Sequence, residues 1–560
     1  MSSLEYYKSY IAQKDNYFLP GSSPKPVAAP IGGWDAISPL ANMQQQFAVT
    51  LQNWYPRPGW VELRGGYNVW ANVGTSVSIN SLLIYRPTSG NERMFAAAGT
   101  NIYEVTNAGV GTVAFALATN DKWQSANFTV PGGSSYLVSV NGNDAPLYFD
   151  GTSWTNPTIT GVTTTPKNFI QVISHQQRLF FVEKNSMRVW YLGVQAISGV
   201  ANVVDVGSFC TKGGFVQSIS AYTLDGGNGP NTMLVIMTNR GQCVIYQGTD
   251  PTSPTAWNLV GVFDLAPPIG TRCFTKIGSD LAIITTSGLI PLSKALPFNP
   301  SSQRELAFTM RIQNAVLQAA QLYSTNFGWE VMLYPAQTMM ILNVPIQTNG
   351  VATQYVMNAI TGAWCSFTGW NANCFERFNE NLYFADNLGN VNIAYTGRTD
   401  FNNVIVADMK CAFNFFEQPG LNKNMTMVKP YLTADGSVTP TMGVDVDFGS
   451  SVLQAPITTT ITNSALWDTG TWDVSSWSGG TITVANWYSV QALGTALAVR
   501  MKFNYGGTNG TNLVTSVGVF DSGTFDSAVF DGTGILTPNT NLPVLQVTAF
   551  ETIQQPGGPV

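Results

Sequence analysis

A short two-stranded unit recurs through the middle of the chain and constrains its fold more than any other feature. Each copy is an alternating strand, a turn of Asn, Gly, Ser or Thr, and a second strand. The copies begin at Met94, Tyr136, Arg178, Met233, Leu281, Val331 and Leu382. Their spacing of roughly 40 to 55 residues is the period of four-stranded propeller blades. Because one hairpin cannot bury its apolar face alone, we predict that residues 42–414 form a β-propeller of roughly six to eight irregular blades.

One segment interrupts this rhythm. Residues 302–321 contain neither Gly nor Pro, and Ser302 precedes Glu305 by three positions, the spacing of a capping box. Apolar residues then follow at helical spacing. We therefore predict one inserted helix near 302–321, either packed on the propeller rim or exposed for a partner.

The two ends of the chain differ from the middle. The Pro-rich run at 22–30 favours an extended, solvated conformation, so residues 1–41 are expected to form an N-terminal arm. Beyond 415 the blade rhythm stops, and strands alternate with long stretches rich in Gly, Ser and Thr. Residues 415–560 are therefore predicted to form a β-sandwich or barrel-like domain, which makes the fold class all-β. With no apolar leader and no long apolar stretch, we expect neither a signal peptide nor a membrane span.

Composition narrows the function. Charged residues make up 10% of the chain and aromatic residues 12%, whereas soluble domains average about 25% charged residues. The 26 basic and 32 acidic residues give a net charge of -6, which argues against wrapping or sequence-specific reading of DNA. His175 is the only histidine, so the usual general base is scarce and we expect no enzyme, no cofactor and no metal site. His175 itself is expected to be a hydrogen-bonded structural residue.

The remaining polar motifs favour structural roles. The six cysteines contain no C-x-x-C pair, and we expect them to be small core residues rather than zinc ligands or disulfides. The segment 150–154 is a distant echo of the sialidase Asp-box, and like 361–364 it is better explained as a tight hairpin turn closed by a core Trp. Asp445 and Asp447 alternate along one strand; solvent exposure is the favoured interpretation, with a metal site as the alternative.

In two segments near the C-terminus an aromatic residue recurs every five residues, a period that matches neither a strand nor a helix. Trp467, Trp472 and Trp477 form the first array, and a similar Phe-Asp array occupies 520–531. Three interpretations stay open: tandem Asx turns with the rings packed down, exposed aromatic docking surfaces, and calcium binding.

Several short motifs occur in a familiar order. They are PIGGWD at 30–35, NWYP at 53–56, VELRGGY at 61–67, SGLIPLS at 287–293, NAITGAW at 358–364, and the Trp-Asp array. In this order the chain resembles the tail nozzle or tail hub proteins of short-tailed bacteriophages, also called head-completion or DNA-stabilisation proteins. The motifs span most of the chain.

The resemblance implies a structural virion protein. Its copies would form a homo-oligomeric ring, a hexamer, beneath the portal and its adaptor protein. The ring would bind a tail fibre or tailspike, retain packaged double-stranded DNA, and conduct it through the lumen at ejection without sequence recognition. It would be made in the host bacterial cytoplasm and reside in the virion tail. A charge-poor, aromatic-rich surface suits large subunit interfaces, and a weakly acidic lumen would let DNA slide.

Two alternatives come from other functional classes. A receptor-binding or polysaccharide-degrading phage tail protein with a propeller fold would have a cleft with paired carboxylates beside exposed aromatics. A cellular propeller scaffold is disfavoured by the irregular blades.

Four residues in the resembling N-terminal region are interface candidates. Trp54, Arg57, Trp60 and Arg64 are predicted to contact a neighbouring subunit or the adaptor, because aromatics and arginine anchor interfaces. Core and turn roles in the first blade are the other interpretation. Trp467, Trp472 and Trp477 are further interface candidates.

Overall fold

The structure, a computed structural model, describes residues 23–225, 230–434, 438–450, 453, 482–505 and 544–559. The chain forms two compact units. One combines Met1–Arg64 with Asn402–Val560, and the other is Gly65–Phe401. The second unit is therefore inserted between two sequence segments of the first.

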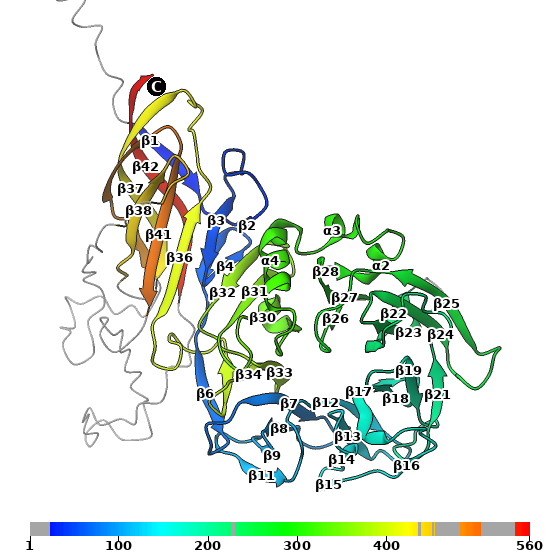
Figure 1. The fold of residues 1–560 in the computed structure, drawn as a ribbon. Helices are drawn as coiled ribbons and strands as arrows, with labels where there is room; N and C mark the ends of the chain where they lie inside the picture. The colour runs from blue at the N-terminus through cyan, green and yellow to red at the C-terminus, as the bar shows by residue number, and fades with distance from the viewer. Residues whose placement is uncertain are drawn as a thin grey trace, which may run out of the picture. The chain divides into compact units, whose positions relative to one another are not determined.

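The Gly65–Phe401 unit is a β-propeller, and its described residues form seven blades around an axis (Figure 1). The first four blades each have four strands. They are β7 (Ile79–Tyr85), β8 (Arg93–Ala98), β9 (Asn101–Glu104) and β11 (Thr112–Phe115); β12 (Gln124–Thr129), β13 (Ser135–Val140), β14 (Leu147–Phe149) and β15 (Trp154–Thr155); β17 (Phe169–His175), β18 (Arg178–Glu183), β19 (Arg188–Tyr191) and β21 (Asn202–Asp205); and β22 (Val216–Asp225), β23 (Pro230–Thr238), β24 (Gln242–Gly248) and β25 (Trp257–Asp264).

The last three blades are less regular. The fifth has three strands, β26 (Phe274–Ile277), β27 (Asp280–Thr285) and β28 (Gly288–Pro291), and the sixth has β29 (Glu330–Tyr334), β30 (Met339–Pro345), β31 (Ala352–Asn358) and β32 (Trp364–Phe367). The seventh has β33 (Cys374–Phe378), β34 (Asn381–Ala385), β35 (Asn390–Ala394) and β6 (Tyr67–Asn72), with β10 (Gly109–Val110) beside β6. A separate parallel pair is β16 (Ile159–Thr160) with β20 (Gly199–Val200).

Antiparallel pairing of β6 with β35 closes the ring, because it joins the first strand of this unit to its last blade. The innermost strands of neighbouring blades contact each other from β7 through β12 and β17 to β22, and again from β26 through β29 and β33 back to β7. The fourth and fifth blades contact through β22 and β27. The predicted propeller is confirmed, and seven lies within the expected range of blades.

The recurring hairpin is the middle of a blade. In six blades it forms the second and third strands, and in the sixth blade it forms the first and second. These strands are packed on both faces; Arg178–Glu183, for example, is buried along its whole length. The apolar cores lie between successive blades, as where Leu83 and Phe95 of the first blade meet Phe149 of the second. Packing between blades is therefore what gives these strands their near-continuous apolar sequence.

Two hairpin turns have the predicted form. The Asp150 Oδ1 atom accepts hydrogen bonds from the backbone N–H groups of Thr152 and Ser153, and Gly151 has a φ of 98° that favours glycine. The side chain of Trp154 then packs edge-on against Phe95. The 361–364 turn is organised likewise, since Asn358 Oδ1 caps it and Trp364 is buried. Both are structural turns.

The fold contains one notable helix, as predicted, but that helix, α4 (Gln313–Tyr323), covers only the second half of the expected 302–321. The segment contains α3 (Gln303–Leu306), the 3₁₀ turn η2 (Met310–Ile312) and α4 (Gln313–Tyr323), following α2 (Leu292–Ala295). The side chain of Ser302 makes no capping hydrogen bond. Phe308 donates its backbone N–H to the carbonyl of Leu289, and the Leu289 N–H donates to Thr309 Oγ1. Pairing with β28 therefore breaks the helix, while α4 packs on β28 and β30 as expected of a rim helix.

The other unit consists of two sheets. One contains β39 (Ile482–Val484), β40 (Tyr488–Gly494), β37 (Leu421–Ala434), β42 (Leu545–Pro559), β5 (Trp60–Leu63), β4 (Trp54–Arg57) and β1 (Ser23–Ala28); the second contains β2 (Gly33–Trp34), β3 (Phe47–Gln52), β36 (Ile405–Cys411), β41 (Leu497–Tyr505) and β38 (Thr441–Val446). The sheets contact each other through β38 with β40 and through β36 with β4. This is a sandwich-like arrangement.

The unit boundaries differ from the expected positions at 42 and 414. Strand β1, part of the predicted solvated arm, pairs along its length with β42, and β3 pairs with β36. Residues before Gly65 therefore belong with the C-terminal strands. The reason is long-range strand pairing, which covers the edges of C-terminal strands and leaves no trace in the local sequence pattern.

Asp445 and Asp447 do not form the solvent-exposed pair that was expected. Asp445 is fully buried on β38, where its carboxylate lies 2.7 Å from the Lys410 ammonium and 3.8 Å from the Arg500 guanidinium. Asp447 follows the end of the strand and accepts hydrogen bonds from the backbone of Thr495 through Oδ1. The basic partners come from β36 and β41, strands too distant in sequence to be recognised beforehand.

Within the described ranges, no helix is long and apolar enough to cross a membrane.

Candidate functional site

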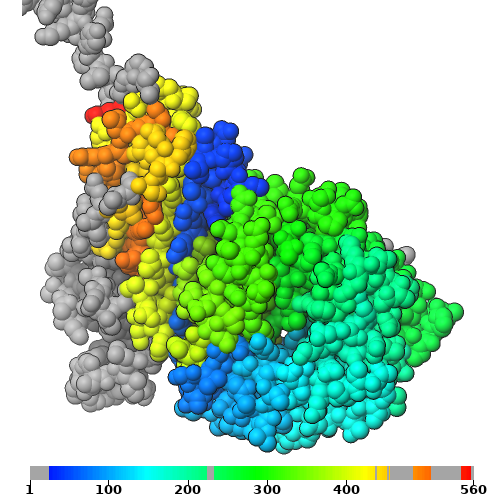
Figure 2. All heavy atoms as spheres, viewed as in Figure 1, coloured from blue at the N-terminus to red at the C-terminus, as the bar shows by residue number. Residues whose placement is uncertain are grey.

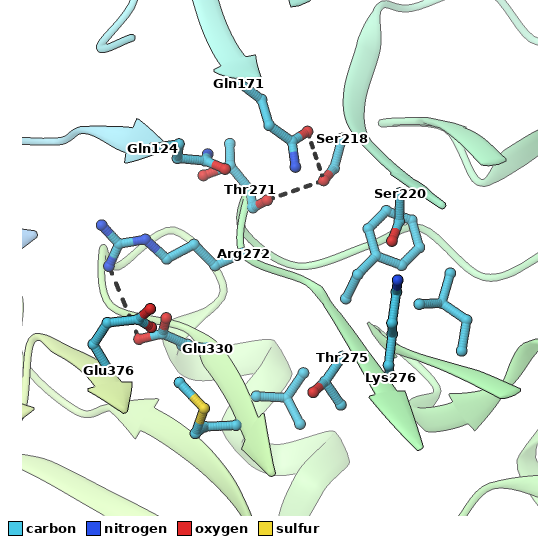
Figure 3. Close-up of a pocket in the computed structure, with 14 residues that line it drawn as sticks. Gln124, Gln171, Ser218, Ser220, Thr271, Arg272, Thr275, Lys276, Glu330 and Glu376 are labelled. Atoms are coloured by element: carbon cyan, nitrogen blue, oxygen red, sulfur yellow. Dashed lines mark hydrogen bonds and ion pairs between the residues drawn. The ribbon is translucent and has the colours of Figure 1, made fainter. Parts of the chain in front are cut away.

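A polar cavity of about 350 Å³ opens on the axis of the propeller. Side chains from the innermost strands of six blades line it: β12, β17, β22, β26, β29 and β33 (Figure 3). The side chains of these innermost strands that point toward the axis lie outside the apolar cores between blades. The topology alone therefore gathers polar residues from six repeats at one place.

One wall of the cavity is hydrogen-bonded by the protein. Gln171 Oε1 accepts from Ser218 Oγ and from the backbone N–H of Ile219, and its Nε2 donates back to the Ile219 carbonyl. The Ser218 hydroxyl also lies 3.0 Å from the carbonyl of Thr271. These residues hold β17 and β22 together, and most of their hydrogen-bonding groups are used within the protein.

Arg272, just before β26, connects blades across the ring. Its Nη2 donates to the Asn80 carbonyl at 2.9 Å and to Ser81 Oγ at 2.8 Å, both on β7. Its Nη1 lies 3.9 Å from Glu330 Oε2, and the guanidinium lies over the Phe327 ring. The first, fifth and sixth blades therefore share one cation.

Glu330 and Glu376 form a carboxylate pair on the neighbouring inner strands β29 and β33 (Figure 3). Glu330 accepts a hydrogen bond from the Phe375 backbone N–H at 2.8 Å. Burial raises the pKa of Glu330, although Arg272 and that N–H oppose the shift. Burial also raises the pKa of Glu376 to about 7, against the nearby Arg86 and reinforced by Glu330. One of the two acids thus titrates near neutral pH.

Four other polar residues of the cavity are not hydrogen-bonded by the described chain. Gln124, Ser220, Thr275 and Lys276 line the cavity, and their side chains have no hydrogen-bond or ion-pair partner among the described residues. All four are exposed or half-exposed. Polar groups concentrated in a cavity without protein partners are available to water or a ligand.

A second surface lies at the perimeter of the propeller, where Figure 1 places the outermost strands β11, β21 and β25. These strands, the short strands β10 and β20, and the adjacent loops expose large apolar side chains: Val110, Val113, Leu117, Val194, Val200, Val203, Leu259 and Val260. Val110 is 79% exposed and Leu117 is 91% exposed. In Figure 2 the first four blades run from blue through cyan to green. We call these residues the apolar perimeter.

The predicted N-terminal interface residues divide into two pairs. Trp54 and Arg64 are fully buried, and Arg64 Nε donates to Asn53 Oδ1 at 2.8 Å. Arg57 and Trp60 are half-buried on the β4–β5 hairpin, where both bond to Glu62, at 2.8 Å and 3.1 Å respectively. These contacts lie in the two-sheet unit, not in a first propeller blade.

Trp54 and Arg64 therefore have core roles, and Arg57 and Trp60 remain the surface members of the set. Trp467, Trp472 and Trp477, together with the Phe-Asp array, lie outside the described residues.

His175 is structural but not hydrogen-bonded as expected. It is 2% exposed, and neither ring nitrogen has a hydrogen-bond partner within the described chain. Its ring packs edge-on against Phe180 and Trp257. Burial, with a smaller contribution from Lys276, lowers the pKa of His175 to about 4. The aromatic neighbours replace the polar partner that was predicted.

All six cysteines are buried and unpaired, as predicted for core residues. Burial raises the pKa of the Cys243, Cys273, Cys374 and Cys411 thiols to about 12. No group of metal-ligating side chains occurs among the described residues.

The sequence interpretation missed Arg272, Glu330 and Glu376. A signal for Glu376 is present in the sequence, because an acid at the centre of the short apolar strand Cys374–Phe378 is out of place in a core. Recognising it required knowing that this strand is the innermost of its blade.

Solved structures similar to this chain are propellers. YCF48 bound to the D1 peptide aligns with 62% of this chain and 98% of its own, at 11% identity and a TM-score of 0.36. The WD40 propeller domain of Doa1 aligns with 59% of this chain and 96% of its own, at 8% identity and a TM-score of 0.36. A quinoprotein alcohol dehydrogenase-like protein from Bacteroides thetaiotaomicron covers 51% of this chain and 65% of its own, at 12% identity and a TM-score of 0.31.

At these identities and TM-scores the likeness carries no conclusion about function, and the propeller fold of this chain is given by its own strand pairing. No protein-family model and no curated protein matches the sequence.

Proposed function

We propose that this protein is a structural subunit of the tail of a short-tailed bacteriophage. Six copies form the nozzle or hub ring that closes the portal-adaptor channel, retains the packaged DNA and conducts it at ejection. The ordered motifs of the sequence suggest this assembly, and the apolar perimeter is the structural observation that carries the proposal. Exposed apolar side chains on the outer strands of several blades favour burial against other subunits.

The partners follow from the same proposal. The adaptor protein binds one end of the ring, and a tail fibre or tailspike binds its outside. Double-stranded DNA passes through the lumen without sequence recognition, and the net charge of -6 favours a weakly acidic lumen that repels phosphates. The protein is made in the bacterial host and resides in the virion tail.

Particle size tests the proposal directly. The purified chain, alone and with its adaptor, is examined by multi-angle light scattering and electron microscopy. Rings of six copies are expected, whereas a monomer that persists in the presence of the adaptor contradicts the proposal.

A matched pair of variants locates the contact. Val113→Lys places a charge on the apolar perimeter and is expected to weaken ring assembly, because burying an unpaired charge at an interface is costly. Thr155→Lys places the same charge at an exposed position on β15 and serves as the control. Assembly that is equally strong in both variants removes the apolar perimeter from the interface.

One observation favours a second function, that of a receptor-binding or polysaccharide-degrading tail protein. The axial cavity contains Glu376, whose pKa is raised to about 7, beside a second carboxyl group, that of Glu330. Glycoside hydrolysis uses such an acid together with a second carboxylate, which must be ionised. Depolymerisation of bacterial surface glycans by the purified protein, abolished in both Glu330→Gln and Glu376→Gln, supports this function. Glycans that stay intact argue against it.

A further inference from the structure

We propose that the axial cavity of the propeller binds a sugar residue that carries a carboxylate. Lys276 pairs with the carboxylate, and the side of the cavity that contains Glu330 and Glu376 accepts hydrogen bonds from the ring hydroxyls. The inference rests on the second candidate function and names its ligand class. The proposal concerns ligand binding only; it requires neither hydrolysis of the ligand nor assembly of the ring.

The distribution of hydrogen bonds identifies the surface that faces the ligand. The wall formed by Gln171 and Ser218 uses its polar atoms within the protein. By contrast, the side chains of Gln124, Ser220 and Thr275 line the same cavity with no hydrogen-bond partner in the described chain. An amide and two hydroxyls, each both donor and acceptor, match a ligand that carries several hydroxyl groups.

The charges identify the anionic group. Arg272 lies 3.9 Å from Glu330, and Arg86 lies 3.8 Å from Glu376, so each of these cations has a carboxylate partner. Lys276 is exposed and has no carboxylate partner among the described residues. The cavity is therefore left with one cation that a ligand carboxylate can neutralise.

Glu330 and Glu376 favour a sugar over an amino acid as the ligand. Figure 3 shows Lys276 across the cavity from the two carboxylates, so the ligand must present an anion on one side and different groups on the other. An amino acid would place its ammonium group beside Glu330 and Glu376, but each already has an arginine partner. Their oxygens can still accept hydrogen bonds, and 28% of the Glu376 side chain is exposed. Neutral hydroxyls fit this position better than a third cation.

Size and shape agree with one sugar residue. A volume of about 350 Å³ is at the small end of ligand sites. Phe274 also lines the cavity, and an aromatic ring offers an apolar face for the C–H groups of a sugar.

Binding is measured with the full chain by saturation-transfer NMR and isothermal titration calorimetry. The probes are glucuronate, galacturonate and N-acetylneuraminate, with glucose as the neutral control and glycine as the amino-acid control. At least one acidic sugar is expected to bind with a dissociation constant near ~1 mM, at least about tenfold more tightly than glucose or glycine.

Two variants assign the contacts. Lys276→Gln is expected to remove the preference for acidic sugars over glucose, whereas Lys294→Gln, at an exposed position on α2, keeps it. Glu376→Gln is expected to weaken the binding of acidic and neutral sugars alike. The proposal is overturned if none of the three acidic sugars binds, if glycine or glucose binds as tightly, or if Lys276→Gln leaves the preference intact. Depolymerisation and ring size are separate measurements, so their failure is distinguishable from this one.

Discussion

Replacing Glu376 with glutamine is expected to remove a specific pH dependence from the stability of the propeller. The folded protein raises the pKa of this acid from 4.5 to about 7 because the carboxylate is buried beside Glu330. The stability that the protonated acid contributes is therefore present below about pH 4.5 and is lost as the pH rises through about 7. A shift of roughly 2.5 units at about 1.4 kcal/mol each gives about 3 kcal/mol. This is an upper bound, because 28% of the side chain remains exposed to solvent.

The assay is urea denaturation followed by tryptophan fluorescence between pH 4 and pH 9. The free energy of unfolding of the unmodified protein, minus that of Glu376→Gln, should fall by up to about 3 kcal/mol across this range. Taking the difference cancels the contribution of titrating groups that do not interact with Glu376, including His175, whereas Glu330 remains coupled to Glu376. Glu305→Gln, which removes an exposed carboxylate on α3, is the control and should retain the original profile. A difference that stays constant with pH, or rises, refutes the assignment of a raised pKa to Glu376.

Two other buried groups lead to further predictions. The pKa of His175 is lowered to about 4, so the stability that its neutral form contributes is present above about pH 6.5 and is lost as the pH falls through about 4. In urea denaturation, His175→Phe should abolish up to about 3 kcal/mol of this loss of stability in acid. An unchanged loss of stability in acid contradicts the prediction. Asp445→Asn leaves the Lys410 charge buried without its carboxylate and should lower the free energy of unfolding by about 3–5 kcal/mol. Asp264→Asn, which breaks a half-exposed pair with Lys212, should cost less than about 1 kcal/mol, and equal losses in the two variants contradict the argument from burial.

The carboxylate pair lies at the inner end of the blades and the apolar perimeter at their outer end, and the two regions have different proposed functions. The inner end of a blade collects polar groups around the axis, whereas its outermost strand has a free edge and exposed apolar side chains. A propeller can therefore bind a small ligand and a neighbouring subunit at the same time. The two proposed functions are compatible for this reason, and the variants proposed for them do not overlap.

Local features of the sequence were sufficient to predict the propeller. Alternation with a period of two specifies strands, and Asp150 and Asn358 specify their turns, because an Asx side chain bonds backbone groups within three residues. The apolar character of the middle strands, and of the six cysteines, follows from the same local pattern. These interactions need no knowledge of distant partners.

Other features depended on residues far away along the chain. The predicted helix breaks because Leu289 bonds to Phe308 and Thr309, and Asp445 is buried because Lys410 and a second cation come to it from other strands. No local pattern contains such pairings.

The sequence by itself therefore determined the all-β class, the repeated hairpins and their turns, since these arise from the alternation of neighbouring residues. Only the tertiary structure decided which strand closes the ring, that the two ends of the chain share their sheets, and that Glu330 and Glu376 meet beside Arg272 on the axis. The physical reason is that strand pairing and charge burial are set by partners tens to hundreds of residues away.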